Sequence, residues 1–183
     1  MKVLSFNCRG FASSPKKLAL RRLLSISQPD IILLQETLCP ADTLIQSFKS
    51  WMPYWTFHAI DASGRSGGLA IGILNKAIKI SNIWGGRGFI GLDIYVLSME
   101  MNLRIVNVYG PCSSRAPFWS ALLESDLLKE DNILLGGDLN FSMGQCESWG
   151  HSALTDPLHH IQPVGGASLG RHTLCQSTAY LDE

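Results

Sequence analysis

Short apolar runs that end at polar residues recur along this 183-residue chain. Residues 31–34 read IILL, a continuous apolar run that is typical of a strand buried on both faces. Residues 2–7 and 132–135 have a similar character, and the second of these runs is too short for a helix. We therefore expect three buried strands in these segments.

Three other segments are expected to be helical. The first begins at Ser14-Pro15, where the serine offers an N-cap and the proline fits the first turn. The second follows Pro40 and runs to about residue 49, and the third covers residues 116–128. Between the last two, turn residues separate five β-prone segments: residues 54–60, 68–74, 77–84, 89–99 and 103–109. Helices separated by many short strands predict a layered α/β or α+β domain.

The composition indicates a lightly charged globular protein, with 46% apolar and 16% charged residues. Fifteen basic and fifteen acidic residues cancel, so any polyanion binding would depend on a local patch. One candidate patch consists of Lys16, Lys17, Arg21 and Arg22, although charges on a helix face are often simply solvated. Five scattered cysteines without a Cys-x-x-Cys pair favour a reducing, intracellular compartment, with nucleus and cytoplasm both open. No run approaches the roughly 20 apolar residues of a membrane helix, so we expect no membrane association. No stable protein partner can be inferred.

Polar side chains stand where the expected strands end: Asn7, Glu36, Tyr109, Asp138 and Asn140. Because side chains alternate along an extended chain, Asp138 and Asn140 are expected to share one face. The two glycines before them would leave room for another group, such as a substrate, to approach the backbone. Each polar residue alone has an ordinary interpretation as a turn residue, a solvated carboxylate or an interfacial tyrosine. Ligands bind at strand ends in layered α/β proteins, however, so the recurrence predicts a site for a hard cation or a phosphate.

Five fragments carry a resemblance to a known family: SFNCRG, PDIILLQET, GGLAIGI, VNVYGP and GGDLNFS, in this order. Together they resemble the endonuclease/exonuclease/phosphatase superfamily, which includes DNase I. The segments NCRGF and ESWG are most similar to the endonuclease domains of plant LINE-type non-LTR retrotransposons. The resemblance covers residues 1–157. It implies a DNase I-like α/β four-layer sandwich, in which two stacked mixed β-sheets are flanked by helices and the site lies between the sheet edges.

The resemblance also implies Mg²⁺-dependent hydrolysis of a phosphodiester, with Mn²⁺ as an alternative cation and the phosphate backbone of DNA as the expected substrate. Glu36 would be the principal metal ligand, with Asn7 beside it. This agrees with the preference of Mg²⁺ for one or two carboxylates and several waters. Asp138 would orient and deprotonate the attacking water, and Asn140 would help to hold the phosphate or the metal shell.

Two further residues would serve the substrate. By resemblance, the hydroxyl of Tyr109 would contact the scissile phosphate, next to the charge that develops in the transition state. Arg115, six residues later, could reach a backbone phosphate of DNA. A surface arginine of this kind is also commonly just solvated.

The sequence departs from the family pattern after residue 157. The family closes with a further aspartate and a Ser-Asp-His motif, and no Ser-Asp-His occurs here. Residues 158–183 are therefore expected to be a divergent, poorly ordered tail that leaves the second sheet incomplete, as a frameshift or a mis-predicted exon would produce. Loss of a catalytic histidine typically costs about two to four orders of magnitude in rate, so activity would be weakened or lost.

Two other interpretations stay open. The protein could be a catalytically inactive remnant that binds nucleic acid or metal, which the missing histidine favours. It could also be a phosphatase that acts on a small phosphoester. The zero net charge leans slightly toward this second alternative, because nucleases gain from a positive cleft.

Overall fold

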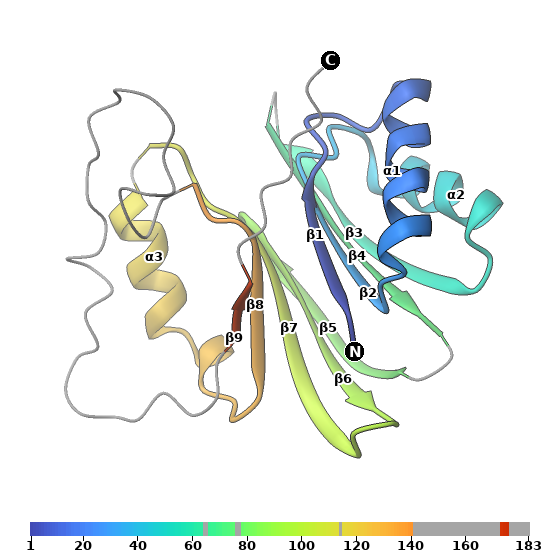
Figure 1. Ribbon diagram of the computed structural model, residues 1–183. Helices are drawn as coiled ribbons and strands as arrows, with labels where there is room; N and C mark the ends of the chain where they lie inside the picture. Colours follow the sequence, from blue (N-terminus) through green and yellow to red (C-terminus); the bar gives the residue numbers. More distant parts are fainter. Residues whose placement is uncertain (64–65, 76–77, 114, 141–172, 176–183) are drawn as a thin grey trace.

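The computed structural model describes residues 1–63, 66–75, 78–113, 115–140 and 173–175, which form two stacked β-sheets between helices (Figure 1). The first sheet has the order β1-β2-β4-β3, with strands Val3–Asn7, Ile31–Gln35, Ser66–Leu74 and Trp55–Ser63. The second has the order β5-β6-β7-β8-β9, with strands Ile78–Gly86, Phe89–Val96, Met101–Tyr109, Ile133–Asp138 and Thr173–Cys175. Both sheets are mixed, because β1 and β2 are parallel, as are β7 and β8, whereas the hairpins are antiparallel.

Helices cover the two outer faces and complete four layers. Helices α1 (Ser14–Ser27) and α2 (Ala41–Trp51) lie on the first sheet, and α3 (Arg115–Glu124) lies on the second (Figure 1). The predicted fold class, a DNase I-like four-layer sandwich, is thereby confirmed. In the described part of the chain, none of the helices is long and apolar enough to span a bilayer.

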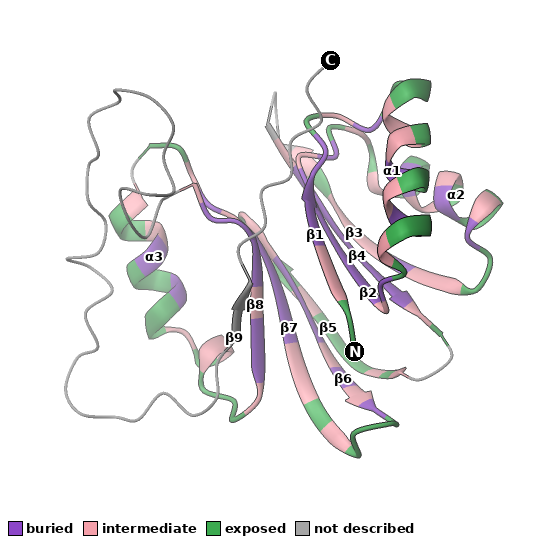
Figure 2. Cartoon of the chain, viewed as in Figure 1, coloured by how far each residue is buried: buried purple, intermediate pink, exposed green. Residues whose placement is uncertain are grey.

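The strands that face both layers are buried along most of their length (Figure 2). All five residues of β2 are buried, as the run IILL predicts. Its side chains alternate between the core under α1 and α2, where Ile32 and Leu34 pack, and the core between the sheets, where Ile31 and Leu33 pack. One strand thus contributes to both cores, which explains why its sequence shows no polar alternation.

A buried asparagine connects the two sheets. Asn107 on β7 has no exposed surface, and its side-chain amide donates to the main-chain oxygens of Leu34 and Ala70 in the first sheet, both at 2.9 Å. The side-chain amide of Gln35 donates to Asn107 Oδ1 at 2.8 Å and to Ser5 Oγ at 3.2 Å. These bonds lie two residues before the end of β7 and at the end of β2, so they join the sheets beside the predicted site.

Three expectations about elements need correction. The third helix ends at Glu124 rather than at 128. Both the hydroxyl and the main-chain amide of Ser125 donate to the Leu122 oxygen, which ends the α-helix. A 3-10 turn follows over Asp126–Leu128. The strand expected over 89–99 ends at Val96, where a turn closes through the Met99 amide. The short strand β9 pairs with β8 beyond residue 158, where no strand was expected, since three residues are too few to show a pattern. The rest of the predicted tail lies outside the described residues.

We predict that Asn107→Ala lowers the free energy of unfolding by about 2–3 kcal/mol, because it leaves the buried Gln35 amide without its partner on β7. Urea denaturation measures this change. The matched control is Asn102→Ala, on the exposed end of the same strand, which should change stability by less than about 0.5 kcal/mol. Equal effects of the two substitutions would show that the buried hydrogen bonds do not hold the sheets.

Candidate active site

Three of the predicted site residues meet where the two sheets adjoin. The Asn7 side-chain amide, at the end of β1, donates to Glu36 Oε1 at 3.1 Å and to Asp138 Oδ2 at 2.7 Å. Asn7 and Asp138 are 4% and 7% exposed, whereas Glu36 is half-buried. The structure therefore brings Asn7 and Glu36, from the first sheet, into contact with Asp138 at the end of a strand of the second sheet.

Tyr109 joins this group from β7. Its backbone pairs in register with Asp138, and its hydroxyl lies near enough to the Glu36 carboxylate for that group to raise its pKa. Burial, followed by the hydrogen bond to Glu36 and the charge of Glu36, raises the pKa of the Tyr109 hydroxyl. The phenol is therefore protonated at neutral pH and acts as a hydrogen-bond donor.

Asn140 lies beside Asn7, Glu36, Tyr109 and Asp138, but it does not continue the strand, as its expected shared face with Asp138 would require. Strand β8 ends at Asp138, and Asn140 has a left-handed backbone with φ +52°, so strand alternation does not place its side chain. Its main-chain amide donates to Asp138 Oδ1 at 3.1 Å, and its side-chain amide donates to the Gly110 oxygen. Asn140 thus fixes one oxygen of Asp138 while Asn7 fixes the other.

Two glycines near Asp138, Gly137 and Gly110, make room for the protein's own backbone. A Cβ on Gly137, which has φ +132°, would lie 2.0 Å from the Val108 oxygen of the neighbouring strand. A Cβ on Gly110 would lie 2.2 Å from the Leu139 oxygen. The space that was expected to admit substrate is occupied by strand β7, and it allows β7 and β8 to present Tyr109 and Asp138 at one edge.

The loops around the site adopt conformations that ordinary residues avoid. Arg9, Glu36, Leu38 and Asn140 all have positive φ between 45° and 52°. Such conformations cost on the order of 1–2 kcal/mol each and persist where surrounding contacts fix them. Glu36 is fixed by its own oxygen, which accepts from the Gly10 amide at 2.7 Å, so the carboxylate is held on a constrained backbone.

Two arginines, Arg115 and Arg87, belong to segments that adjoin the second sheet. Arg115 begins α3 and donates from Nε to the Cys112 oxygen at 3.3 Å. Within the described residues, no hydrogen bond or ion pair joins it to Asn7, Glu36, Tyr109 or Asp138. Its predicted contact with DNA therefore stays a prediction. Arg87, in the turn between β5 and β6, was not singled out in the sequence, although the surrounding GGRGF marks an unusual glycine-rich turn.

The donor set suits a hard cation. Glu36 and Asp138 supply carboxylate oxygens within 3.1 Å of the same amide nitrogen, and Asn7 Oδ1 accepts from the Arg9 amide at 3.0 Å. In the described ranges, no three His, Cys, Asp or Glu side chains gather into a metal-binding group. Two carboxylates with amide oxygens fit Mg²⁺, which keeps several waters, better than they fit zinc, which prefers nitrogen and sulfur.

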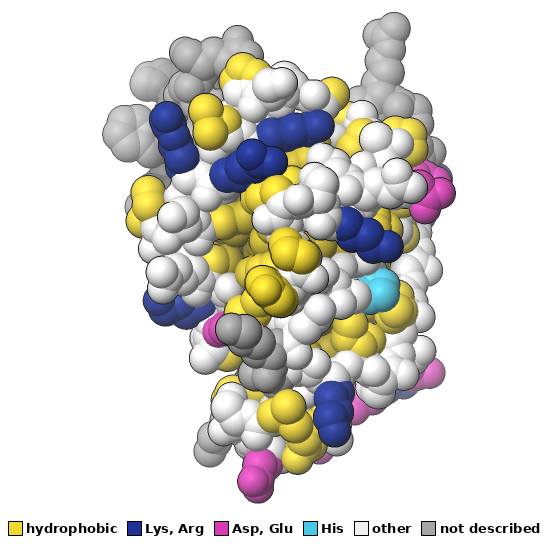
Figure 3. Space-filling model, turned by 90° about the vertical axis from the view of Figure 1, so that its right-hand side faces the viewer, with side chains coloured by type: hydrophobic (Ala, Val, Ile, Leu, Met, Phe, Trp, Pro, Cys, Tyr) yellow, Lys and Arg dark blue, Asp and Glu magenta, His cyan; other side chains and the backbone are white. Residues whose placement is uncertain are grey.

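Three of the four basic residues on α1 make contacts within the protein. Lys17 lies over the Phe11 ring at 5.6 Å, Arg21 lies over Trp51 at 4.5 Å, and Lys16 donates to the Arg9 oxygen. On this side of the molecule, several lysine and arginine side chains lie near one another in the upper part of the view, among hydrophobic ones (Figure 3). Binding of a polyanion by this group stays a prediction.

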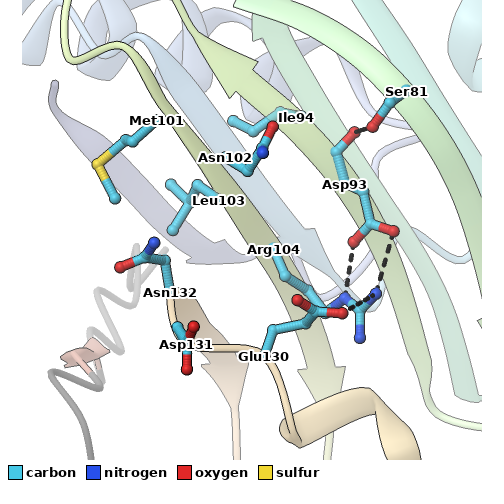
Figure 4. Close-up of a pocket in the computed structure, with 10 residues that line it drawn as sticks. All are labelled: Ser81, Asp93, Ile94, Met101, Asn102, Leu103, Arg104, Glu130, Asp131 and Asn132. Carbon is cyan, nitrogen blue, oxygen red and sulfur yellow. Dashed lines mark hydrogen bonds and ion pairs between the residues drawn. The ribbon is translucent and has the colours of Figure 1, made fainter.

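A cavity of about 550 Å³ lies at the opposite end of the second sheet (Figure 4). Its centre is Arg104, which binds Asp93 through Nε at 2.7 Å and Glu130 through Nη2 at 3.2 Å. The guanidinium also donates to the main-chain oxygens of Asp126 and Leu127. Because these partners occupy the arginine, it acts as a structural tie between β6, β7 and the 3-10 turn.

This tie predicts a pH-dependent contribution to stability. The hydrogen bond from Arg104 lowers the pKa of the Asp93 carboxyl, so the stabilisation is present above the ordinary pKa of an aspartate and is lost as pH falls through the lowered value. Asp93→Asn should cost about 1 kcal/mol at pH 7, since the pair is partly exposed, and nothing at the acidic limit. Urea unfolding at several pH values measures the difference, and a cost that is constant with pH would contradict the assignment.

The comparisons with known proteins agree with this fold. Residues 4–160 match the model of the Endonuclease/Exonuclease/phosphatase family, and the chain belongs to this family. It is 27% identical over 155 residues to Recombination repair protein 1 of Drosophila melanogaster, covering 78% of this chain and 22% of that protein.

Solved structures of the same fold are similar at low sequence identity. The AP endonuclease of Archaeoglobus fulgidus superposes with a TM-score of 0.62 at 17% identity, covering 82% of this chain and 61% of that one. D. rerio TDP2 with a single-strand DNA product gives 0.61 at 16%, with coverages of 78% and 61%. The human Nocturnin catalytic domain gives 0.62 at 15%, with coverages of 78% and 64%. The chain therefore spans less than two thirds of the length of these structures.

Proposed function

We propose that the protein hydrolyses phosphodiesters of nucleic acid with the aid of Mg²⁺ or Mn²⁺. The observation that carries this proposal is the Asn7 amide, which joins Glu36 from one sheet to Asp138 from the other. A binding position that is shared by two carboxylates and faces a protonated tyrosine suits a cation and a phosphate together. Bound there, the cation would polarise the phosphoryl oxygens.

The residues then have separate roles. Glu36, on its constrained backbone, would hold the cation, with Asn7 beside it. Asp138 has each carboxylate oxygen fixed by a hydrogen bond, from Asn7 and from the Asn140 amide, so it is oriented to align and accept a proton from a water molecule. Tyr109 would turn its hydroxyl from Glu36 to a phosphate oxygen and stabilise the charge of the transition state.

DNA is the substrate that the comparisons favour. Among the similar proteins are a Recombination repair protein, AP endonucleases and a TDP2 bound to a single-strand DNA product. The segments NCRGF and ESWG support an origin in a LINE-type retroelement.

A small phosphoester is the second candidate substrate. A mannosyl-6-phosphatase of Bacteroides thetaiotaomicron has the same fold, with a TM-score of 0.59 at 14% identity, covering 79% of this chain and 67% of that one. The zero net charge of the present chain favours this alternative, since a small substrate needs no extended positive surface.

Incubation of the purified protein with supercoiled plasmid and Mg²⁺ should produce nicked circles, and EDTA should prevent this. Asp138→Ala should lower the nicking rate at least about 100-fold, because the water loses its acceptor. Asp131→Ala, an exposed carboxylate ahead of the same strand, is the matched control and should leave the rate unchanged. Folded protein that cleaves neither plasmid nor small phosphoesters would disprove hydrolysis and favour the inactive remnant.

Tyr109→Phe should lower the single-turnover rate by about 10–100-fold, since it removes a donor to the developing charge and keeps the ring. Binding of Mn²⁺, followed by electron paramagnetic resonance, should stay within about twofold, because the tyrosine is not a proposed ligand. Tyr95→Phe, at the far end of the second sheet, serves as control. If metal affinity falls in parallel with the rate, Tyr109 acts on the cation rather than on the phosphate.

A further inference from the structure

The turn between β5 and β6 carries an exposed arginine. Gly86 pairs with Phe89, so Arg87 and Gly88 form a two-residue turn, and Gly88 has φ +84°. The Arg87 side chain is exposed. Within the described ranges, no ion pair involves Arg87, so its charge is not used to hold the fold.

This turn is fixed against the candidate active site. The Tyr109 amide donates to the Gly88 oxygen at 2.8 Å. A Cβ on Gly88 would lie 3.1 Å from the Tyr109 oxygen and 3.0 Å from the Phe118 ring, so Gly88 is in close contact with both. Arg87 is therefore one Cα step, about 3.8 Å, from a residue that is bonded to Tyr109.

Aromatic rings hold the turn in spite of its glycines. The Phe89 ring lies over Gly86 and the Trp84 ring lies over Gly91, where a Cβ would meet ring atoms at 2.6 and 2.1 Å. These rings also pack against each other, with centroids 5.9 Å apart. Because the turn is packed, Arg87 is presented in a defined place and a ligand would not have to order the loop.

A small phosphoester would not need this residue. A single phosphate would be engaged by the cation at Glu36 and by the Tyr109 hydroxyl, whereas a strand of nucleic acid carries further phosphates on each side. On the side of the first sheet, the exposed Arg9 lies two residues after Asn7, and its main-chain amide donates to Asn7 Oδ1 at 3.0 Å. The acidic residues Glu130 and Asp131 lie at the opposite end of the second sheet, around the cavity of Figure 4.

We propose that Arg87 binds a backbone phosphate next to the scissile one and so favours a nucleic-acid strand over small phosphoesters. This inference rests on the proposed function, because it assigns the substrate class of the same site. A guanidinium suits the role, since it binds phosphate through two parallel N–H donors.

The test is the binding of a fluorescein-labelled DNA duplex and of the corresponding single strand, measured by anisotropy in EDTA so that cleavage is absent. Arg87→Ala should weaken binding about tenfold, as expected for the loss of a charged hydrogen bond. The slope of log K against log salt should fall by about 0.9 for the duplex. Arg87→Lys should retain the salt slope and recover only part of the affinity.

The matched control is Lys79→Ala. Lys79 is exposed on the same hairpin but at its other end, roughly 25 Å from Arg87 at about 3.3 Å per residue of strand. It should leave affinity and salt slope unchanged. Equal behaviour of the two alanine variants would overturn the inference.

The outcome is separable from that of the proposed function. Wild-type protein that binds neither form of DNA, yet hydrolyses a small phosphoester, would overturn the role of Arg87 and leave phosphoester hydrolysis intact. DNA binding that depends on Arg87 in a protein with no hydrolytic activity would retain the binding role and reject the catalytic one.

Discussion

The hydrogen bonds of Asn107 are the constraint on which the rest of the structure depends. The core between the sheets is made of aliphatic side chains, and burial of such side chains is favourable but not directional. Apolar packing alone would tolerate small displacements of one sheet along the other. Asn107 removes this freedom, because its amide must reach two carbonyls of β2 and β4 at 2.9 Å while its oxygen accepts from Gln35. A shift that broke these bonds would leave buried polar groups unpaired, at a cost of about 1–3 kcal/mol each.

The geometry of the candidate site depends on this alignment of the two sheets. Two carboxylates that come from different sheets would repel each other, and the neutral amide of Asn7 donates to both and reduces the repulsion. A cation between the same carboxylates would do so more strongly, which is the physical reason for assigning them to a metal. The distance between Glu36 and Asp138 is thus set by the register of the sheets, and the register is set by Asn107 and Gln35 directly beneath.

The sequence predicts the layers well where a segment carries its own pattern. The run IILL is typical of a strand that is covered on both faces. The polar residues at strand ends were expected to meet because ligands bind at strand ends in layered α/β proteins, and the parallel pairs β1 and β2, and β7 and β8, end at this site. Asn107 was not foreseen, because an isolated polar residue in RIVNVY does not reveal which carbonyls it will meet. The position of Asn140 also depended on tertiary contacts, since its left-handed backbone and its bond to Gly110 involve a residue thirty positions away.

The glycines near the site also show what could not be predicted from the sequence. Gly136-Gly137 predicted correctly that something approaches the backbone closely, but the sequence could not say whether this was a substrate or a strand. In the structure it is the Val108 oxygen that Gly137 admits, and the turn at Gly88 admits Tyr109 and Phe118 in the same way. The contact at Gly137 holds β7 against β8, and the contact at Gly88 holds β7 against the turn between β5 and β6. Tyr109 is therefore positioned by two glycines: Gly137 admits the main chain of Val108, and Gly88 accepts the hydrogen bond of the Tyr109 amide.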